Sequence, residues 1–310
     1  MTLTQLSYIV AVDKYRHFAT AAEKIYVTQP TLSMQIHKLE EQLGVKIFDR
    51  SKSPVVPTEI GETIIREASV ILKQARQIED LARLSDGVLK GTFRIGVIPT
   101  IAAYLIPVFL RPFMEAWPEV ELVFEEKLTS QVLDGLQDDT LDIGIIATPT
   151  DQSQIYLEEL YNEPFVGFLS ADHPLASKEK LQISDLDVSE IWLLNEGHCL
   201  RDQSMKLCKK EKKNENSPIR FESGNLETLK RLVEQNYGMT LMPALAVRDF
   251  NRDCSTALIR EFEDPVPSRK VRLAYSRKFL KQNMIQAFRD SVQENLPAEL
   301  RLKEDLMVIE

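Results

Sequence analysis

The sequence predicts an α/β protein in which an N-terminal winged helix-turn-helix and a long linker helix precede a two-lobed C-terminal α/β domain. Helix-start and helix-stop signals recur at short intervals over the first 57 residues. A long helical pattern without proline follows, and from residue 91 onward apolar strand patterns alternate with helical ones. The predicted domains are therefore a winged helix-turn-helix at residues 1–57, a linker helix and hinge at 58–90, and a C-terminal domain at 91–310.

Length and composition agree with a globular protein of two or three packed domains. The chain has 310 residues, of which 44% are hydrophobic and 27% charged. No stretch approaches the ~20 apolar residues that a membrane-spanning helix needs. The first residues also lack the basic and apolar regions of a signal peptide. We expect a cytoplasmic protein without a membrane partner.

The net charge of −9 is unevenly distributed along the chain. Residues 1–57 hold seven Lys or Arg against five Asp or Glu, a balance of +2, so the other 253 residues carry −11. The N-terminal part can therefore approach phosphate groups although the whole chain is acidic. Three cysteines are too few for a disulfide framework, and in a reducing compartment such thiols are structural, catalytic or redox-sensing.

Three short helices are predicted in the first 44 residues. Thr2 with Gln5 forms a capping box before the first helix, and the second covers residues 18–25. Thr28 can cap a third helix, which has a proline in its first turn and stops at Gly44. Tyr26 and Val27 form a short connector between the second and third helices. Two helices joined by such a short turn form a helix-turn-helix, whose second helix enters the major groove of double-stranded DNA.

The third predicted helix presents polar groups suited to DNA. The residues expected to contact DNA there are Gln29, Pro30, Thr31, Ser33, Met34, Gln35 and Lys38. Amide side chains can hydrogen-bond adenine and the lysine can bind a phosphate group, although an amphipathic helix with a solvated face has the same pattern.

Along the linker helix, apolar residues follow a heptad alternation at Ile64, Ala68, Ile71, Ala75, Ile78 and Ala82. This seam predicts a homodimer, and the alternative is a helix lying on its own C-terminal domain.

The C-terminal domain is predicted to be a doubly wound, mostly parallel sheet. Predicted strands cover residues 92–98, 120–124, 142–147, 164–170, 191–194, 239–243 and 270–275, and predicted helices cover 102–117, 130–137 and 226–236. Lobe I comprises about residues 91–162 and 269–300, and lobe II about 163–268. A cleft is expected at the carboxyl ends of the strands, where ligands of such sheets usually bind.

The segment LNEGHCLRDQ at residues 194–203 carries candidate thiol chemistry. Cys199 is predicted to begin a helix, and the helix dipole together with His198 and Arg201 should lower its pKa and populate the reactive thiolate. A sulfenic acid formed there needs a second thiol, and Cys208 lies nine residues on. Nine helical residues rise ~13.5 Å, whereas a disulfide needs Cα atoms about 4.4–6.8 Å apart. Bridging the two cysteines would therefore unwind this segment.

Simpler interpretations exist for several of these residues. Cys254 is expected to be a small buried hydrophobic residue. His198 could do no more than hydrogen-bond the backbone, and Thr100 could cap the helix after Pro99. A metal site built from Cys199, His198 and Cys208 would lack a fourth ligand, so we expect no metal and no cofactor.

The N-terminal segment AAEKIYVTQPTLSMQIHKLEEQLGVKIFDRS resembles the helix-turn-helix signature of LysR-type regulators. It includes their Phe-x-Arg motif at the start of the wing, which adds Arg50 to the DNA-binding residues. The chain departs from the family pattern at Pro57, where leucine is usual. The resemblance implies a dimer that pairs into a homotetramer and a periplasmic-binding-protein-like C-terminal domain. It also implies RNA polymerase as a partner.

The block GHCLRDQ, with a second cysteine nine residues beyond its own, resembles the peroxide-sensing branch of the LysR-type family. The resemblance extends less densely along nearly the whole chain. It implies hydrogen peroxide as the signal, Cys199 as the peroxidatic residue and Cys208 as the resolving one. Glutaredoxin- or thioredoxin-like dithiol reductants would restore the thiols, and the implied role is activation of oxidative-stress genes. The implied peroxide pocket consists of Thr100, Thr129, His198, Arg201 and Arg269.

The lysine-rich stretch KKEKKNENSP after Cys208 departs from the peroxide-sensing pattern. The alternative function is a LysR-type regulator that binds a small organic acid in the cleft, with both cysteines incidental. A thiol peroxidase has the least support, because an enzyme of that kind has no use for a DNA-binding module. We therefore expect a protein that is not an enzyme.

Overall fold

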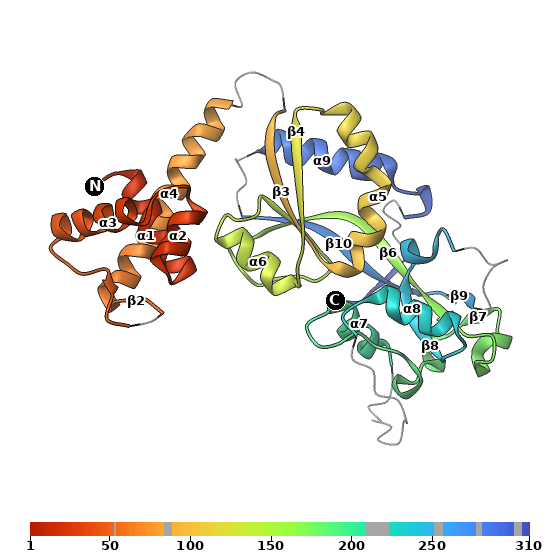
Figure 1. The fold of residues 1–310 in the computed structure, drawn as a ribbon. Helices are drawn as coiled ribbons and strands as arrows, with labels where there is room; N and C mark the ends of the chain where they lie inside the picture. Colours follow the sequence, from red (N-terminus) through yellow and green to blue (C-terminus); the bar gives the residue numbers. More distant parts are fainter. Residues whose placement is uncertain (53, 84–88, 209–222, 251–256, 277–280, 301–305) are drawn as a thin grey trace. The chain divides into compact units, whose positions relative to one another are not determined.

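The computed structural model describes the chain except for residues 53, 84–88, 209–222, 251–256, 277–280 and 301–305. It divides into two compact units, Met1–Gly87 and Val88–Glu310 (Figure 1). Within the described residues, no helix is both long and apolar enough to cross a membrane. Cys254 and the lysine-rich stretch lie outside the described residues.

The first unit is a winged helix-turn-helix followed by a long helix. Its elements are α1 (Leu3–Tyr15), α2 (Phe18–Lys24), α3 (Gln29–Leu43), β1 (Phe48–Asp49), β2 (Val56–Pro57) and α4 (Glu59–Arg83). The predicted capping box of Thr2 and Gln5 is present, and the Thr28 hydroxyl accepts from the third backbone N–H of α3. Gly44 ends α3 in the left-handed region at φ 70°, which explains the glycine. The strands β1 and β2 pair antiparallel as the wing.

The wing is fastened to α4 by a close backbone approach at Gly61. A Cβ atom added there would lie 2.0 Å from the carbonyl oxygen of Ile47, so a larger residue would separate the helix from the strand. The Thr58 hydroxyl accepts from the Gly61 N–H at 3.0 Å, as expected for the cap of α4. The same hydroxyl donates to the carbonyl of Lys46.

The predicted seam of α4 is divided between two roles. Ala68 is buried in the core of its own unit and Ile64 is half-buried against it, because α4 packs on α1. In contrast, Ile71 is 36% exposed and Ile78 is 70% exposed. The prediction that the whole heptad stripe is free to face a partner is therefore wrong for its first two positions. The exposed part of the seam begins at Ile71.

The second unit is a mixed α/β structure with two hydrophobic cores, one in each lobe. Lobe I contains β3 (Gly91–Val97), α5 (Pro99–Ala116), β4 (Val120–Glu126), α6 (Thr129–Gln137), β5 (Ile143–Ile146) and α9 (Gln282–Asn295). Lobe II contains β7 (Lys180–Leu181), α7 (Cys199–Leu207), α8 (Leu226–Glu234), β8 (Met239–Pro243) and β9 (Leu258–Phe262). Short 3-10 helices cover Pro174–Ser177, Ile183–Asp185, Val188–Glu190, Ala244–Val247 and Ala298–Leu300.

Two long antiparallel strands, β6 (Tyr156–Leu169) and β10 (Val266–Tyr275), join the lobes. The sheet order is β4-β3-β5-β10-β6-β9-β7, with β8 paired to β6 and β11 (Leu306–Val308) paired to β10. The chain crosses from β3 to β4 in one direction and returns past β3 to β5. These two crossovers run in opposite directions along the sheet and place α5 and α6 on its opposite faces, as Figure 1 shows.

Most predicted elements of this unit are confirmed, with three corrections. The prediction of a mostly parallel sheet is wrong: the sheet is mixed, because β5 and β6 pair antiparallel with β10, and β8 and β9 pair antiparallel with β6. The predicted strand at 191–194 is wrong: Ile191 and Leu194 form isolated bridges to two different partners, Met239 and Ser223, so no ladder develops. The predicted strand at 164–170 is the second half of β6, whose first half pairs with β10 instead. Neither β9 nor α9 was predicted.

Candidate DNA interface and redox site

Helix α3 presents most of the predicted DNA-contacting residues to solvent. Gln29, Pro30, Thr31, Met34 and Lys38 are exposed. Ser33 and Gln35 are half-buried and engaged within the unit: Ser33 accepts a hydrogen bond from Arg50 at 3.0 Å, and Gln35 accepts one from Gln5 at 3.3 Å. The exposed residues therefore cover the first turn of the helix and one side of its middle.

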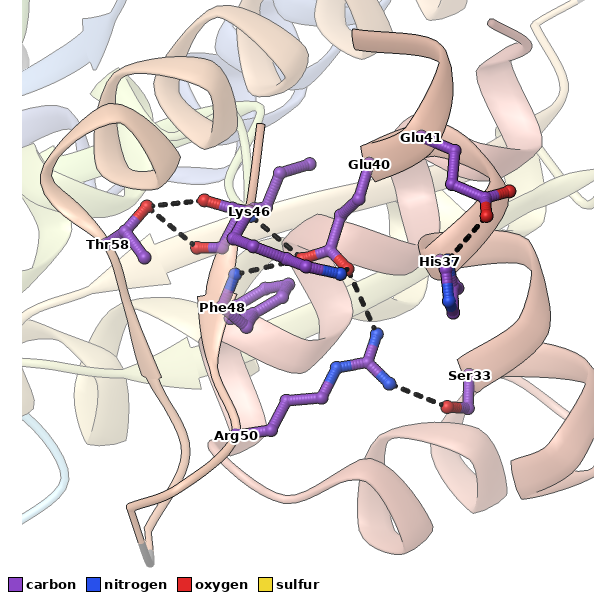
Figure 2. A network of polar contacts seen from close by, with 9 residues as sticks. Ser33, His37, Glu40, Glu41, Lys46, Phe48, Arg50 and Thr58 are labelled. Atoms are coloured by element: carbon purple, nitrogen blue, oxygen red, sulfur yellow. Dashed lines mark hydrogen bonds and ion pairs between the residues drawn. The ribbon is translucent and has the colours of Figure 1, made fainter. Parts of the chain in front are cut away.

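A buried carboxylate holds α3 against the wing (Figure 2). Glu40 is almost completely buried, and its Oε1 accepts the backbone N–H groups of Ile47 at 2.8 Å and Phe48 at 3.3 Å. Its Oε2 lies 3.3 Å from an Arg50 guanidinium nitrogen and 3.7 Å from the Lys46 Nζ. One side chain thus links the recognition helix to the first strand of the wing.

Arg50 faces inward more than the sequence pattern predicts. Its guanidinium bridges Glu40 and Ser33 and lies 4.8 Å from the ring centroid of Phe18, a cation–π geometry. The side chain remains 37% exposed, so one edge is still open to a phosphate group. In the absence of DNA, the guanidinium already stabilises the contact between α3 and the wing.

Two residues of this interface were not predicted from the sequence. Glu40 follows directly after Leu39 on the apolar side of α3. A carboxylate at that position could have been recognised in the sequence as a buried group that needs hydrogen-bond partners. Tyr26 occupies the turn before α3 in the left-handed region at φ 56° and is 95% exposed. An aromatic side chain held so far into solvent can donate its hydroxyl proton to a phosphate oxygen.

In the second unit, the two predicted redox cysteines lie at opposite ends of α7. Cys199 is the first residue of the helix, after Gly197 at φ 91° and His198, and Cys208 is the residue at which the helix ends. Both are free thiols. Cys199 is buried in the core of lobe I, whereas Cys208 is half-buried against the core of lobe II. The helix therefore separates the two sulfur atoms.

A fully buried guanidinium, that of Arg269 on β10, lies close enough to Cys199 for its charge to act on the thiol. Its Nε and one Nη donate to the same carboxylate oxygen of Glu163 at 2.9 and 2.7 Å. The two Nη atoms also donate to the Thr100 hydroxyl and to the Thr100 carbonyl, each at 3.0 Å. Because the Thr100 hydroxyl accepts from Arg269, its own proton is available to a ligand. The structure thus brings together Thr100, Cys199 and Arg269 from three distant parts of the sequence.

The predicted low pKa of Cys199 is wrong for this state of the protein. Burial raises the pKa of the Cys199 thiol, the positive charge of Arg269 offsets part of this increase, and Asp202 adds to it. Burial also raises the pKa of Cys208 to about 11, with a contribution from Asp187. Both thiols are therefore protonated at neutral pH: at Cys199 the loss of water outweighs the charge of Arg269, and at Cys208 burial and Asp187 act in the same direction.

The cations that the sequence placed beside Cys199 have other roles. Arg201 donates to the backbone carbonyl of Leu194 at 2.8 Å, which stabilises the loop before α7. His198 is buried and burial lowers its pKa, so its ring is neutral at pH 7. The cation that acts on the thiol is Arg269, which lies seventy residues from Cys199 in the sequence.

Thr129 is the first residue of α6, near the loop that precedes Cys199. A Cβ atom added at Gly197 would lie 3.1 Å from a methyl carbon of Leu128, which places the loop against the start of α6. The Thr129 hydroxyl oxygen is buried and has no hydrogen-bond partner among the described residues. A buried hydroxyl without a partner is suited to a small polar ligand or a water molecule.

Family comparisons match both units of the chain. Residues 3–62 match the bacterial regulatory helix-turn-helix of the lysR family, and residues 86–297 match the LysR substrate binding domain. The chain belongs to the LysR family. This LysR-family protein is a DNA-binding transcription regulator, with the winged unit as its DNA-binding part.

Similar proteins include several regulators named for peroxide. The LysR-family chain is 33% identical over 297 residues to the hydrogen peroxide-inducible genes activator of Dickeya chrysanthemi, covering 96% of each chain. It is 36% identical over 248 residues to the DNA-binding transcriptional dual regulator OxyR of Escherichia coli K12, covering 80% of each. These relatives favour a redox-sensing regulator over one that binds a small organic acid.

Solved structures agree with this family assignment. A full-length OxyR variant from Pseudomonas aeruginosa has a TM-score of 0.76 at 36% identity, with 94% of this chain and 97% of that chain covered. The reduced regulatory domain of OxyR from the same organism has a TM-score of 0.59 at 31% identity, with 66% and 97% covered. The LysR-family fold therefore includes both units described above.

Proposed function

We propose that this LysR-family regulator senses hydrogen peroxide through a Cys199–Cys208 thiol/disulfide switch and activates oxidative-stress genes in the cytoplasm. The supporting observation is the position of Cys199 at the start of α7, beside the buried guanidinium of Arg269 and the hydroxyl of Thr100. The names of the OxyR relatives support the choice of hydrogen peroxide. Glutaredoxin- or thioredoxin-like dithiols are the proposed reductants.

In the proposed chemistry, the Cys199 thiol first loses its proton and the thiolate sulfur attacks one oxygen of hydrogen peroxide. The O–O bond breaks, the sulfur becomes a sulfenic acid, and the departing hydroxide takes up a proton to leave as water. The Cys208 sulfur then attacks the Cys199 sulfur, which releases a second water molecule and forms the disulfide. Two thiols and one peroxide thus give one disulfide and two waters.

The proposed peroxide pocket combines groups with complementary roles. Thr100 and Thr129 would hydrogen-bond the two peroxide oxygens, since one hydroxyl has a free proton and the other has no partner among the described residues. Arg269 would stabilise the thiolate. His198 is proposed to line the pocket as a neutral donor or acceptor, and Arg201 to support the loop through Leu194.

Disulfide formation would require α7 to come apart. Cys199 and Cys208 are separated by nine residues, or ~13.5 Å along a helix, and a disulfide tolerates Cα atoms only about 4.4–6.8 Å apart. Leu200 and Leu207 of α7 are buried in the core of lobe II, so unwinding would rearrange that core as well. Oxidation of two cysteines would in this way change the surface of lobe II.

For DNA binding, we propose that residues 1–57 carry the contacts and that α3 lies in the major groove. Gln29, Pro30, Thr31, Met34 and Lys38 would lie closest to the duplex. Ser33, Gln35 and Arg50 would contribute from their half-buried positions, and Tyr26 is added as a phosphate contact. RNA polymerase is the proposed partner of the DNA-bound form.

We propose that residues 58–90 join two chains into a homodimer, and that dimers pair into a homotetramer through residues 91–310. The exposed isoleucines of α4 support this: a monomer would leave Ile71 and Ile78 in water. Two recognition helices would then meet half-sites about one helical turn apart.

Replacing Ile78 by glutamate is expected to weaken dimerisation by at least tenfold, because two buried carboxylates would face each other in the seam. Sedimentation velocity over a range of concentrations measures this. The control is Ser69→Glu, which adds the same charge at an exposed position on the other side of α4. An unchanged association constant for Ile78→Glu would place the interface elsewhere.

The central experiment titrates the reduced protein with hydrogen peroxide and follows both disulfide formation and DNA footprint. We expect one Cys199–Cys208 disulfide per equivalent of peroxide, found by peptide mass analysis without reduction, and a changed footprint in the same samples. Cys199→Ser should abolish both, and Cys208→Ser should stop at the sulfenic acid. A footprint that ignores peroxide but responds to an organic acid would contradict the proposal.

A further inference from the structure

The charge of Arg269 is shared between two acidic groups. Glu163 binds it directly through two hydrogen bonds to one oxygen, and both side chains are essentially inaccessible to water. The same positive charge favours the thiolate of Cys199 through space, without a hydrogen bond between the two groups. Four of the five guanidinium N–H groups are engaged by Glu163 and Thr100, which holds the guanidinium in place.

Glu163 is held directly opposite Arg269. The two residues are cross-strand partners on β6 and β10, the Glu163 carboxylate accepts two hydrogen bonds from Arg269, and the nearby backbone of Leu245 also favours its ionised form. Burial raises the pKa of Glu163, and the charge of Arg269 opposes that increase. A buried guanidinium requires a counterion, because an unpaired charge in a dry interior is strongly destabilising.

We propose that Glu163 is a positioning residue that competes with the Cys199 thiolate for the charge of Arg269 and thereby sets the peroxide sensitivity of the switch. This inference rests on the function proposed above. While Glu163 neutralises Arg269, the Cys199 thiolate receives only part of the stabilisation that the guanidinium charge can give. When the carboxylate is weakened or withdrawn, the thiolate becomes the counterion that Arg269 requires.

The other titratable groups around Arg269 and Cys199 leave this competition intact. Asp202 on α7 disfavours the thiolate, and Tyr161 on β6 has its pKa raised far above neutrality by burial, so it stays protonated. Burial likewise raises the pKa of Tyr104 on α5, which donates to Glu227 on α8 at 2.6 Å. Neutral His198 adds no charge at pH 7.

The test compares Glu163→Gln with the parent in a chain carrying Cys208→Ser and Cys254→Ser, so that one thiol remains. The ultraviolet absorbance of the thiolate, followed against pH, reports ionisation without requiring reagent access. A matched Cys199→Ser chain provides the background from tyrosines. We expect the pKa of Cys199 to fall by about one to three units in Glu163→Gln. The thiolate fraction rises about tenfold per unit and its nucleophilicity falls about threefold, so the peroxide rate should rise about threefold per unit.

Two further variants make the outcome specific. Glu227→Gln makes the same chemical change at a neighbouring carboxylate that Arg269 does not bind, and the pKa of Cys199 should stay constant. Glu163→Asp keeps the charge but retracts it by one methylene, so the pKa should fall less than in Glu163→Gln. If Glu163→Gln does not fold, the direction of the Glu163→Asp shift decides. An unchanged or raised pKa of Cys199 overturns the inference.

The inference and the proposed function fail in different ways. A lowered pKa of Cys199 in Glu163→Gln would support the competition even if peroxide formed no disulfide in the chain that retains Cys208. In that case the proposed function would be wrong and the charge coupling correct. Conversely, normal disulfide formation with an unshifted pKa would support the sensor and overturn the role of Glu163.

Discussion

Replacing Glu40 by alanine is expected to lower the free energy of unfolding of the N-terminal unit by about 3–5 kcal/mol. The change would leave the backbone N–H groups of Ile47 and Phe48 buried without an acceptor, and it would remove the partner of Arg50. Hydrogen exchange in peptides spanning α3 and the wing should become faster by on the order of a hundredfold or more. DNA affinity should fall with it, because the helix and the wing lose their common anchor.

The matched control for this prediction is the next residue. Glu41 is exposed and lies 3.6 Å from His37, so Glu41→Ala should change stability by no more than about 0.5 kcal/mol. Figure 2 shows the two carboxylates on the same helix in these different surroundings. Equal effects of the two substitutions would mean that the Glu40 network does not stabilise the wing.

Replacing Arg269 by methionine is expected to slow the reaction of Cys199 with peroxide by about tenfold or more. The pKa of Cys199 is already raised by burial, and Arg269 is the cation that opposes this. Its removal should therefore raise the pKa further and leave less thiolate at pH 7. Stopped-flow kinetics with peroxide and the thiolate absorbance against pH measure the two effects separately.

The same substitution should destabilise the C-terminal unit in a pH-dependent way. Without Arg269, Glu163 is a buried acid with no counterion, and its folded-state pKa rises further above the value in the unfolded chain. A group with such a raised pKa contributes most to stability below the unfolded pKa, and the contribution is lost as pH rises through the folded pKa. The deficit should therefore be larger at neutral than at acidic pH. A deficit independent of pH would argue against an ionised Glu163.

Arg201→Met is the control that separates sequence proximity from spatial proximity. Arg201 is two residues from Cys199, but its guanidinium donates to the Leu194 carbonyl. We expect the pKa of Cys199 to change far less than in Arg269→Met. If Arg201→Met had the larger effect on the pKa, the assignment of Arg269 as the thiol's cation would be wrong.

Local signals predicted most of the fold, and elements without such signals were missed. The caps at Thr2 and Thr28 and the stop at Gly44 are decided by hydrogen bonds within a few residues, so they can be recognised in the sequence. Helix α9 begins after Lys281, which is in the left-handed region at φ 51° and makes no side-chain cap. No start signal marks that helix, and packing on α5 stabilises it instead.

The sequence by itself determined the winged helix-turn-helix, the long helix after it, and Cys199 at the start of α7, because caps and periodicity act over short separations. Tertiary structure decided which charges meet. Arg269 lies 106 residues from Glu163 and 169 from Thr100, and they are joined because β10 pairs with the middle of β6 beside the start of α5. Burial then reversed the expected shift in the pKa of Cys199, since desolvation depends on the whole packed core.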